Sequence, residues 1–390
     1  MTDPPPTLAV RTLDTADHAA YVGSLQSASF LQTPAWGRVK TDWRPESLGW
    51  FDRDRLVGAA LVLHRALPRI GRTLAYLPEG PVLDWTGATP SGATRTGALA
   101  SYLDPLVAHL RAGGAFAVRM GPPVVTRRWQ AATVKKAVAD PALARLGDVP
   151  ADGTDPVGAA VVAHLQAAGW RQQAADGGFG AGQPQYVFQV PLAGRDEDAL
   201  LAGMNQQWRR NIKKAAKAGV GVRPGGREDL PAFHALYAET AARDGFTARP
   251  LAYFEQMWDA LLAEDPDRIR LYLAEHEGDL VAATTLVRVG AHAWYSYGAS
   301  STAKRDVRGS NAVQWRMIRD AREAGAAVYD LRGITDTLDE ADPHVGLVQF
   351  KVGTGGEAVE YAGEWDLPLS RVLYRAFVLG RAFAPYLRRR

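Results

Sequence analysis

"FDRDRLVGAALVLHRALPRIGRTLAYLPEGPV" (residues 51–82) and "EHEGDLVAATTLVRVGAHAWYSYGAS" (275–300) share one pattern, and this pattern decides the fold. Each stretch begins with a charged turn, continues through an apolar strand, turns, and enters an aromatic strand. Alternating apolar positions and β-branched residues are typical of strands, and a short polar turn between two of them indicates a hairpin. The two stretches therefore predict the same hairpin twice.

The residues after each hairpin also match. An apolar-periodic helix is expected at 97–112, followed by Gly113 and Gly114 and a buried strand at 115–120. A second helix is expected at 311–324, followed by Gly325 and a strand at 326–333. Glycine just beyond the last helical turn is a common stop signal. We interpret the chain as two copies of one α/β unit, with chance similarity of two such units as the alternative.

The expected domain junction lies between a loop rich in Pro, Gly and Asp at 147–158 and a glycine-rich loop at 177–185. A short helix is expected at 159–170 between them, and a strand at 186–192 after them. The segment 369–390 has helical periodicity and is expected to pack back on the first domain. The prediction is a first domain of residues 1–186, completed by 363–390, and a second domain of residues 187–362.

Composition excludes several classes of site. The 390-residue chain has a net charge of only +3 and no cysteine, which excludes disulfides, thiolate zinc sites and cysteine nucleophiles. Its eight histidines lack metal-ligand spacing, so neither a metal nor a cofactor is expected. The N-terminus has no signal-peptide pattern, and no apolar run reaches about 18 residues. We expect a cytoplasmic monomer that meets a membrane only at its inner face.

One helix start has the chemistry of an anion site. In "KRDVRGSNAVQW" (304–315), Gly309, Ser310 and Asn311 open the second predicted helix, where free backbone N–H groups would attract a phosphate. A hairpin–helix–strand unit also resembles the acetyltransferase fold, whose members hold coenzyme A at such a place, but the spacing here differs from that family's loop. Capping of the helix by Ser310 or Asn311 is the favoured interpretation, and coenzyme A binding is the alternative.

Seven blocks in order along nearly the whole chain resemble the FemABX peptidoglycan-bridge enzymes. They are "FLQTPAWGRVK" (30–40), "YLPEGPVLDW" (76–85), "WRRNIKKAAKAGV" (208–220), "RDGFTARPLAYFEQM" (243–257), "YSYGASS" (295–301), "NAVQWRMIRDAREAGAAVYDLRGI" (311–334) and "GLVQFKVGTGGEAVEYAGEWDL" (346–367). The resemblance implies an α/β fold of two tandem acetyltransferase-like (GNAT-like) domains with mixed sheets.

The resemblance also implies an activity. The enzyme would transfer an amino acid (Gly, Ala or Ser) from aminoacyl-tRNA to the side-chain amine of the third stem-peptide residue of a peptidoglycan precursor. That precursor is UDP-MurNAc-pentapeptide or lipid II. The reaction would be direct aminolysis of the ester in an interdomain cleft, without coenzyme A. The transferred amino acid and the acceptor residue stay open.

Site residues follow from the matching positions. Lys40 and Arg249 correspond to the pair that contacts the precursor's diphosphate, a group that needs convergent cations. Trp36, Tyr253 and Tyr297 correspond to residues along the precursor, with core packing as an equal alternative for Tyr253. Lys351 corresponds to a lysine near the reaction centre, where a cation would stabilise the developing oxyanion. Phe350 corresponds to a positioning residue.

Two departures from the family stand out. The family often carries an acid in the motif after the first-domain helix, whereas this chain has "RMGP" with Gly121 at that position. Some members also insert a long helical hairpin in the second domain, and the segment 250–272 is too short for one. We therefore expect no long coiled-coil arm.

The stretch "WRRNIKKAAKAG" (208–219) has five cations and no acid. On a helix, one stripe would carry Arg209, Lys213 and Lys217 at positions i, i+4 and i+8. The flanking cations are Arg210 and Lys214, and the residues expected to face inward are Trp208, Ile212 and Ala216. Contact with the tRNA backbone is the hypothesis, and a solvated surface is the alternative.

Other functions remain in competition. One is a coenzyme A-dependent N-acetyltransferase of related fold, and another is a non-catalytic binder of cell-wall precursors, with Gly121 as the sign of lost activity. The terminal helix places Arg371, Arg375 and Arg381 beside apolar residues and could lie on an anionic membrane. A core helix with basic capping is the favoured interpretation of that segment.

Overall fold

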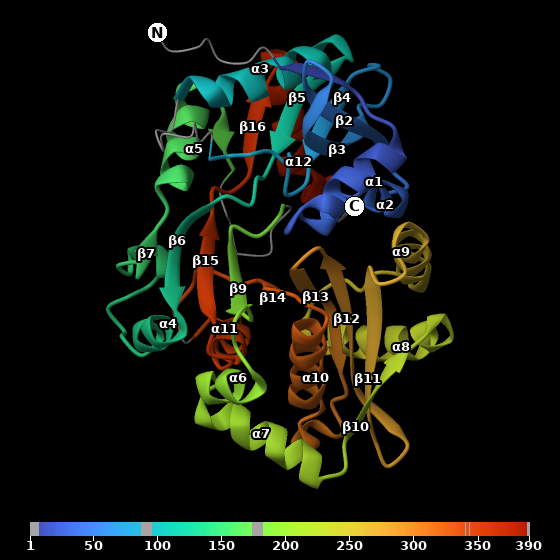
Figure 1. Cartoon of the computed structure of the whole chain (residues 1–390), viewed down its shortest axis with the longest axis vertical. Helices are drawn as coiled ribbons and strands as arrows, with labels where there is room; N and C mark the ends of the chain where they lie inside the picture. The colour runs from blue at the N-terminus through green and yellow to red at the C-terminus, as the bar shows by residue number, and fades with distance from the viewer. Residues whose placement is uncertain (1–7, 87–95, 174–181, 340, 343, 388–390) are drawn as a thin grey trace.

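Two mixed β-sheets form the two halves of the protein (Figure 1). The computed structural model describes residues 8–86, 96–173, 182–339, 341–342 and 344–387. The seven-stranded sheet has the order β1-β2-β3-β4-β5-β16-β8 and consists of β1 Ala9–Thr12, β2 Arg44–Asp52, β3 Arg55–Ala66, β4 Thr73–Leu77, β5 Ala115–Met120, β16 Trp365–Pro368 and β8 Arg171–Gln172. The nine-stranded sheet has the order β10-β11-β12-β13-β14-β9-β15-β6-β7 and consists of β10 Gly221–Gly225, β11 Ile269–His276, β12 Asp279–Val289, β13 His292–Ser300, β14 Val328–Gly333, β9 Tyr186–Pro191, β15 Glu357–Tyr361, β6 Val125–Gln130 and β7 Gly153–Thr154.

The predicted unit occurs in both sheets. Strand β3 pairs antiparallel with β4, and β4 pairs parallel with β5 after the crossover helix α3 (Thr96–Ala112). In the same way, β12 pairs antiparallel with β13, and β13 pairs parallel with β14 after α10 (Gly309–Glu323). Gly114 (φ 86°) and Gly325 (φ 81°) take the left-handed conformation after these helices, as the sequence predicts.

Helices cover both faces of each sheet. Those of the first half are α1 Thr15–Ser24, α2 Pro34–Val39, α3, α5 Pro156–Ala167 and α12 Arg371–Leu387. Those of the second half are α4 Ala131–Val138, α6 Glu197–Gly203, α7 Gln206–Lys217, α8 Leu230–Asp244, α9 Leu251–Glu264, α10 and α11 Val345–Val352. Successive strand residues point to opposite faces, so in β4 Ala75 packs with α3 and α5, whereas Leu74 packs with α12. The described part of the C-terminal segment, residues 369–387, thus packs back on the first half, as expected.

One hydrophobic core joins the two halves. It contains Phe30 and Trp36 from the first half and Phe254 and Met257 of α9 from the second. The Glu264 carboxylate of α9 accepts a hydrogen bond from the backbone N–H of residue 35 in α2, at 2.7 Å. This shared core fixes α2 against α9.

Strands also cross between the halves. Strands β6 and β7 precede residue 186 yet pair in the nine-stranded sheet, and β16 follows residue 363 and pairs in the seven-stranded sheet. Across the β6–β15 pair, Arg127 contacts Glu360 at 2.6 Å and Arg128 contacts Glu357 at 2.5 Å. The division into domains at residue 186 stays a prediction, and the sheets divide the strands as described here.

The start of α10 differs from the prediction. Its N-cap is Arg308, in the left-handed conformation (φ 63°), and no side chain caps the helix, so the prediction of a Ser310 or Asn311 cap is wrong. Asn311 is buried and its side-chain oxygen instead accepts a hydrogen bond from Asn211 of α7, at 3.2 Å. Gly309 lies so close to β12 that a Cβ atom would stand 2.7 Å from Val281. Packing rather than capping determines this helix start.

Two other features bear on the predictions. Between β10 and β11 the longest helices are α8 and α9, of 15 and 14 residues, in agreement with the expected lack of a long arm. Among the helices that the structure describes, none combines the length and the apolar character that crossing a membrane requires. The glycine-rich stretch 177–181 lies outside the described residues.

Candidate active site

The five residues predicted to contact the precursor meet where α2 packs against α9. Trp36 is buried in α2, and Lys40 forms the C-cap of that helix. Arg249 precedes α9, Tyr253 lies in its first turn, and Tyr297 lies on β13. Residues more than 200 positions apart in the sequence are thus neighbours, because the shared core holds the two helices together.

Cations and aromatic rings alternate in this group, which we call the cation–aromatic cluster (Trp36, Lys40, Arg249, Tyr253 and Tyr297). The Lys40 Nζ atom lies 5.0 Å from the ring centre of Trp36 and 5.5 Å from that of Tyr253. The Arg249 guanidinium carbon lies 5.1 Å from the same Tyr253 ring, on which both cations therefore converge. The hydroxyls of Tyr253 and Tyr297 share a hydrogen bond of 3.0 Å.

The cluster carries positive charge that no ion pair balances among the described residues. Within the described parts of the chain, neither Lys40 nor Arg249 forms an ion pair with a carboxylate. Burial, and to a smaller extent the positive charge of Arg249, lower the pKa of Lys40 to about 8. An anion bound between the two cations would relieve this repulsion, so the cluster has the electrostatics of an anion site.

Lys351 lies outside this cluster and is buried in α11, with 3% of its surface exposed. Its Nζ atom donates hydrogen bonds to the carbonyl oxygens of Gly333, at 2.6 Å, and Arg332, at 3.4 Å. Burial lowers the pKa of Lys351 to about 7, opposed by the nearby charge of Asp330. Lys351 is therefore poised between its charged and neutral forms near neutral pH.

Phe350, its neighbour, serves packing in the structure. The Phe350 ring lies 4.8 Å from the Trp208 ring of α7, and the Phe350 carbonyl accepts a hydrogen bond from the Trp208 indole at 2.8 Å. Gly353 makes room for this contact, because a Cβ atom there would collide with the Trp208 ring. The pair connects the basic helix α7 to the helix that bears Lys351.

A partly buried ion pair connects Lys351 to the cation–aromatic cluster. Arg332, whose carbonyl accepts from Lys351, contacts Glu79 at 2.7 Å, and its guanidinium carbon lies 5.6 Å from the Phe30 ring centre. Phe30 packs edge-on against Trp36, with ring centres 5.3 Å apart. Glu79 (φ 48°) and Arg332 (φ 62°) both have left-handed backbones, which is costly for residues other than glycine and is often found at functional sites.

Sequence reasoning missed this ion pair and the chain of hydrogen bonds beyond it. Arg332 donates to Gln183 at 3.1 Å, Gln183 donates to the Tyr76 hydroxyl at 3.3 Å, and Tyr76 donates to Glu364 at 2.6 Å. Charged residues within mostly apolar strand ends, as in "YLPEG", "YDLRG" and "YAGEW", were the signal that the sequence offered. No local pattern indicates that these three strand ends meet.

Glu364 occupies the space beside Gly121. A Cβ atom at Gly121 would stand 2.9 Å from the Glu364 Cγ atom, so an acid at position 121 and the present Glu364 could not both fit without a shift. Burial raises the pKa of Glu364, and the hydrogen bond from Tyr76 lowers it again. The carboxylate that the sequence lacks at position 121 is thus present on a neighbouring strand end.

The basic helix α7 matches its prediction only in part. Arg210, Lys213, Lys214 and Lys217 are exposed, and none of them forms an ion pair with any carboxylate that the structure describes. Arg209 has a structural contact, because one nitrogen of its guanidinium donates hydrogen bonds to the backbone carbonyls of residues 202 (3.2 Å) and 204.

The inward face of α7 also differs from the prediction. Trp208 is buried and Ile212 half-buried as expected, but Ala216 is exposed and Ala215 is buried in its place. The expected inward position at Ala216 is therefore wrong. The buried Trp208 anchors the start of the helix on α11, and this contact sets which positions face the core.

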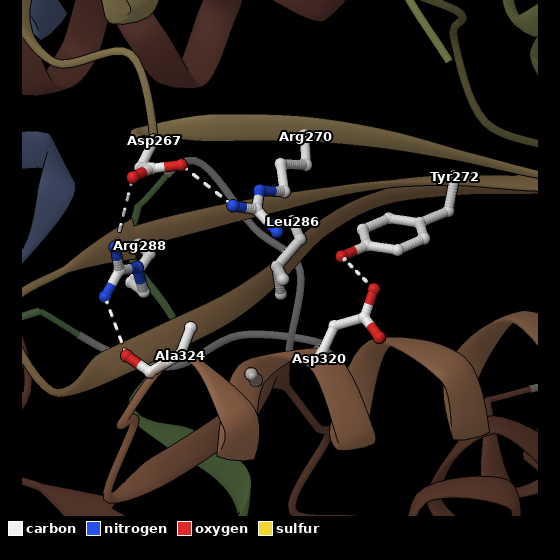
Figure 2. A pocket seen from close by; sticks show the side chains of 8 residues that line it. Asp267, Arg270, Tyr272, Leu286, Arg288, Asp320 and Ala324 are labelled. Atoms are coloured by element: carbon white, nitrogen blue, oxygen red, sulfur yellow. Dashed lines mark hydrogen bonds and ion pairs between the residues drawn. The ribbon is translucent and has the colours of Figure 1, made fainter. Parts of the chain in front are cut away.

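Figure 2 shows a separate hollow between β11, β12 and the C-terminal end of α10. Asp267 holds Arg270 at 2.8 Å, Arg288 donates to the Ala324 carbonyl at 3.0 Å, and Tyr272 donates to Asp320 at 3.0 Å. Each charged side chain of this hollow already has a partner. Lys40 and Arg249 of the cation–aromatic cluster, by contrast, form no ion pair with a carboxylate that the structure describes.

Comparison with known proteins gives a family and a fold. The family model described as the FemAB family matches residues 13–277 and 272–380. A lipid II:glycine glycyltransferase of Staphylococcus aureus (strain MRSA252) is 25% identical over 427 residues, which cover 92% of each protein. The protein of the same name from strain USA300 matches to the same extent.

Solved structures agree on the architecture. A crystal structure of FemX has a TM-score of 0.77 at 23% identity, covering 94% of this chain and 99% of that one. A tandem GNAT protein from the clavulanic acid biosynthesis pathway has a TM-score of 0.50 at 13% identity, covering 93% and 99%. These likenesses confirm the predicted fold of tandem acetyltransferase-like units with mixed sheets.

Proposed function

The chain belongs to the FemAB family, and from this premise we propose that it is a tRNA-dependent aminoacyltransferase of peptidoglycan synthesis. Its reaction adds Gly, Ala or Ser from aminoacyl-tRNA to the side-chain amine of the third stem-peptide residue of a precursor. The precursor is UDP-MurNAc-pentapeptide or lipid II, and the name of the staphylococcal relatives supports the lipid-linked form. Charged tRNA is a cytoplasmic molecule, so the reaction belongs in the cytoplasm.

One observation carries the proposal: Lys40 and Arg249 are two uncompensated cations that converge on one aromatic ring. A diphosphate carries the charge that would satisfy both, and an arginine fork and a lysine point charge are suited to its oxygens. Trp36, Tyr253 and Tyr297 would then contact the remainder of the precursor. The lowered pKa of Lys40 supports this assignment, because a bound anion restores the charged form.

The chemistry is aminolysis of an ester. The acceptor amine attacks the aminoacyl carbonyl, a C–N bond forms, and the C–O bond to the tRNA ribose breaks. Negative charge grows on the carbonyl oxygen during the attack, and protonated Lys351 stabilises it more in the transition state than in the ground state. Phe350 positions α11 through its contact with Trp208.

The amine must also lose a proton. We assign this proton to the Glu364 carboxylate, which replaces the acid that position 121 lacks. Burial makes Glu364 a stronger base than an exposed glutamate, and Tyr76 holds its carboxylate at 2.6 Å. Glu364 then returns the proton to the departing ribose oxygen, which balances the reaction.

The donor tRNA is assigned to α7. Arg210, Lys213, Lys214 and Lys217 present four exposed cations without partners among the described carboxylates, as expected of a surface that binds a phosphate backbone. Arg209, also predicted for this role, contributes less to the surface because one of its guanidinium nitrogens already donates to two backbone carbonyls. Trp208 connects this surface to the helix of Lys351.

The test is to incubate the protein with a pool of charged tRNAs and either precursor and to measure the mass added. One aminoacyl residue should be added, only when charged tRNA is present. Lys40→Met and Arg249→Met should each weaken precursor binding about tenfold or more, as expected for a hydrogen bond to a charged group. Lys135→Met, an exposed lysine on α4, is the matched control and should bind normally.

The outcomes separate the competing functions. Transfer of an acetyl group, with micromolar binding of coenzyme A, would identify an N-acetyltransferase instead. Precursor binding without any mass gain would identify a non-catalytic binder. Normal precursor binding by both methionine variants would refute the diphosphate assignment.

A further inference from the structure

Large apolar side chains are exposed together on α12. Of the six large hydrophobic residues that are exposed among the described residues, three lie on this helix: Val372 is 78% exposed, Leu379 59% and Val378 45%. Exposed apolar residues that stand alone are ordinary, but a group on one helix face marks an interaction surface.

The opposite side of α12 fixes this orientation. Tyr374 is buried and donates to Asp366 of β16 at 2.7 Å, and Phe377 packs on Phe116 of β5 with ring centres 5.5 Å apart. Figure 1 shows α12 lying along this part of the seven-stranded sheet. The exposed residues therefore point outward because the helix is already anchored by its other face.

A neighbouring turn adds to the same surface. Leu67 packs in the small cluster that also holds Leu373 and Phe377 of α12. The backbone N–H of Leu67 donates to the carbonyl of Arg72 at 2.7 Å, which closes a turn with Ile70 at its tip, 52% exposed. We call α12 and the turn 67–72 together the α12 face.

The α12 face is positively charged throughout. Arg371 and Arg375 are exposed on the helix, and Arg69 and Arg72 are exposed on the turn. None of the four forms an ion pair with a carboxylate that the structure describes. Neither 65–75 nor 371–387 contains an acidic residue. Exposed aliphatic side chains beside unpaired arginines match a bilayer with anionic headgroups, which accepts both at once.

The contrast with α7 favours lipid over nucleic acid as the occupant. The exposed residues of α7 are cations and small or polar residues, and none of its large apolar side chains is exposed. A phosphate backbone would satisfy the charges of the α12 face but would leave Val372, Val378 and Leu379 in water. A lipid surface would bury them.

We propose that the α12 face docks on an anionic membrane surface. This inference rests on the proposed function and deepens it, because it favours a lipid-linked acceptor. Trp43 packs both against the α12 cluster and against the core shared with α2, and it follows Lys40 by three residues. The proposed diphosphate site thus lies next to the docking surface, where the headgroup of a lipid-linked precursor would be.

The experiment is flotation of the full-length protein with vesicles of phosphatidylcholine alone or mixed with phosphatidylglycerol. The wild type should bind the mixed vesicles and not the neutral ones. Arg371→Gln and Arg375→Gln should each weaken binding about fivefold, the amount expected for one cation near an anionic surface. Val372→Asp/Leu379→Asp should abolish binding. Two controls should bind as the wild type does: Phe246→Asp, an exposed apolar residue elsewhere, and Lys135→Gln.

The readouts separate this inference from the proposed function. Val372→Asp/Leu379→Asp should retain its thermal stability and full transfer to soluble UDP-MurNAc-pentapeptide while losing transfer to vesicle-bound lipid II. The docking proposal would be wrong if the wild-type protein did not bind anionic vesicles, or if the aspartate double variant bound them normally. Loss of tRNA binding instead of vesicle binding would overturn it as well, in favour of a nucleic acid. Failure of the wild type to transfer an aminoacyl group to either the soluble precursor or vesicle-bound lipid II would reject the proposed function and leave the vesicle-binding result standing.

Discussion

Lys351 shows what burial does to a single residue in this protein. A lysine in water has a pKa near 10.5, and burial in α11 lowers that of Lys351 to about 7. The side chain therefore loses its proton as the pH rises through 7, and any function that needs its positive charge is lost in the same range. The sequence predicted a cation here, but only the burial of Lys351 against the carbonyls at the end of β14 reveals that its pKa is lowered so far.

The pH dependence of turnover tests this role. With precursor and charged tRNA saturating, kcat should decline as the pH rises above about 7, because neutral Lys351 no longer stabilises the oxyanion. Lys351→Arg keeps its proton at every pH and should remove this alkaline decline, at a lower maximal rate. Lys351→Met should lower kcat about 100-fold and leave the precursor Kd unchanged. A kcat that rises through pH 7 in the wild type alone would instead make the neutral lysine a base.

Glu364 is the second residue whose role depends on its surroundings. Glu364→Gln keeps the shape and the Tyr76 contact but cannot accept a proton, so kcat should fall about 100-fold with little change in precursor affinity. Gly121→Asp should also impair the enzyme, since its Cβ atom would stand 2.9 Å from Glu364. The double variant Gly121→Asp/Glu364→Gly should regain activity relative to Glu364→Gly. Single-turnover rates should be measured for all four variants. Full activity of Glu364→Gln would contradict the assignment of Glu364 as the proton acceptor.

At the level of elements, the sequence pattern predicted the features that depend on neighbouring residues in the chain. The two hairpins, the crossover helices and their glycine stops follow from periodicity and turn residues, and the structure confirms them. The place of β6 and β7 in the nine-stranded sheet could not be predicted in this way. Strand β6 is polar for a central strand, and its place depends on Arg127 and Arg128 meeting Glu360 and Glu357, more than 200 residues later.

The residues of the candidate site likewise fall into those that the sequence could indicate and those that only the folded chain brings together. Resemblance identified Lys40, Arg249 and Tyr253, and the structure brings them together because α2 and α9 share a core. The Glu79–Arg332 pair and Glu364 escaped prediction, because their significance lies in three strand ends that meet only in the folded chain. The helix start at Arg308 escaped it for a similar reason, since close packing of Gly309 on Val281 outweighed local capping preferences.

At the scale of the whole molecule, the charged surfaces lie on different halves. Figure 1 shows α12 on the first half and α7 at the far end of the second, with α2 and α9 between the halves. The proposed arrangement places membrane and precursor on one side and the tRNA donor on the other. The contact between Trp208 and Phe350 connects the donor helix to Lys351, so the tRNA surface adjoins the reaction centre without forming part of it.

The salt dependence of donor binding tests this arrangement. Lys213→Glu/Lys217→Glu should raise the KM for charged tRNA about tenfold or more and should reduce the slope of log K against log salt by about 2, because two phosphate contacts are lost. Precursor affinity should not change, since that site lies between the halves. Lys135→Glu/Lys136→Glu on α4 makes the same charge change on another exposed helix and should leave both quantities unaltered. If the α7 and α4 pairs behave alike, α7 is only a solvated surface, and the donor must approach Lys351 from another side of the molecule.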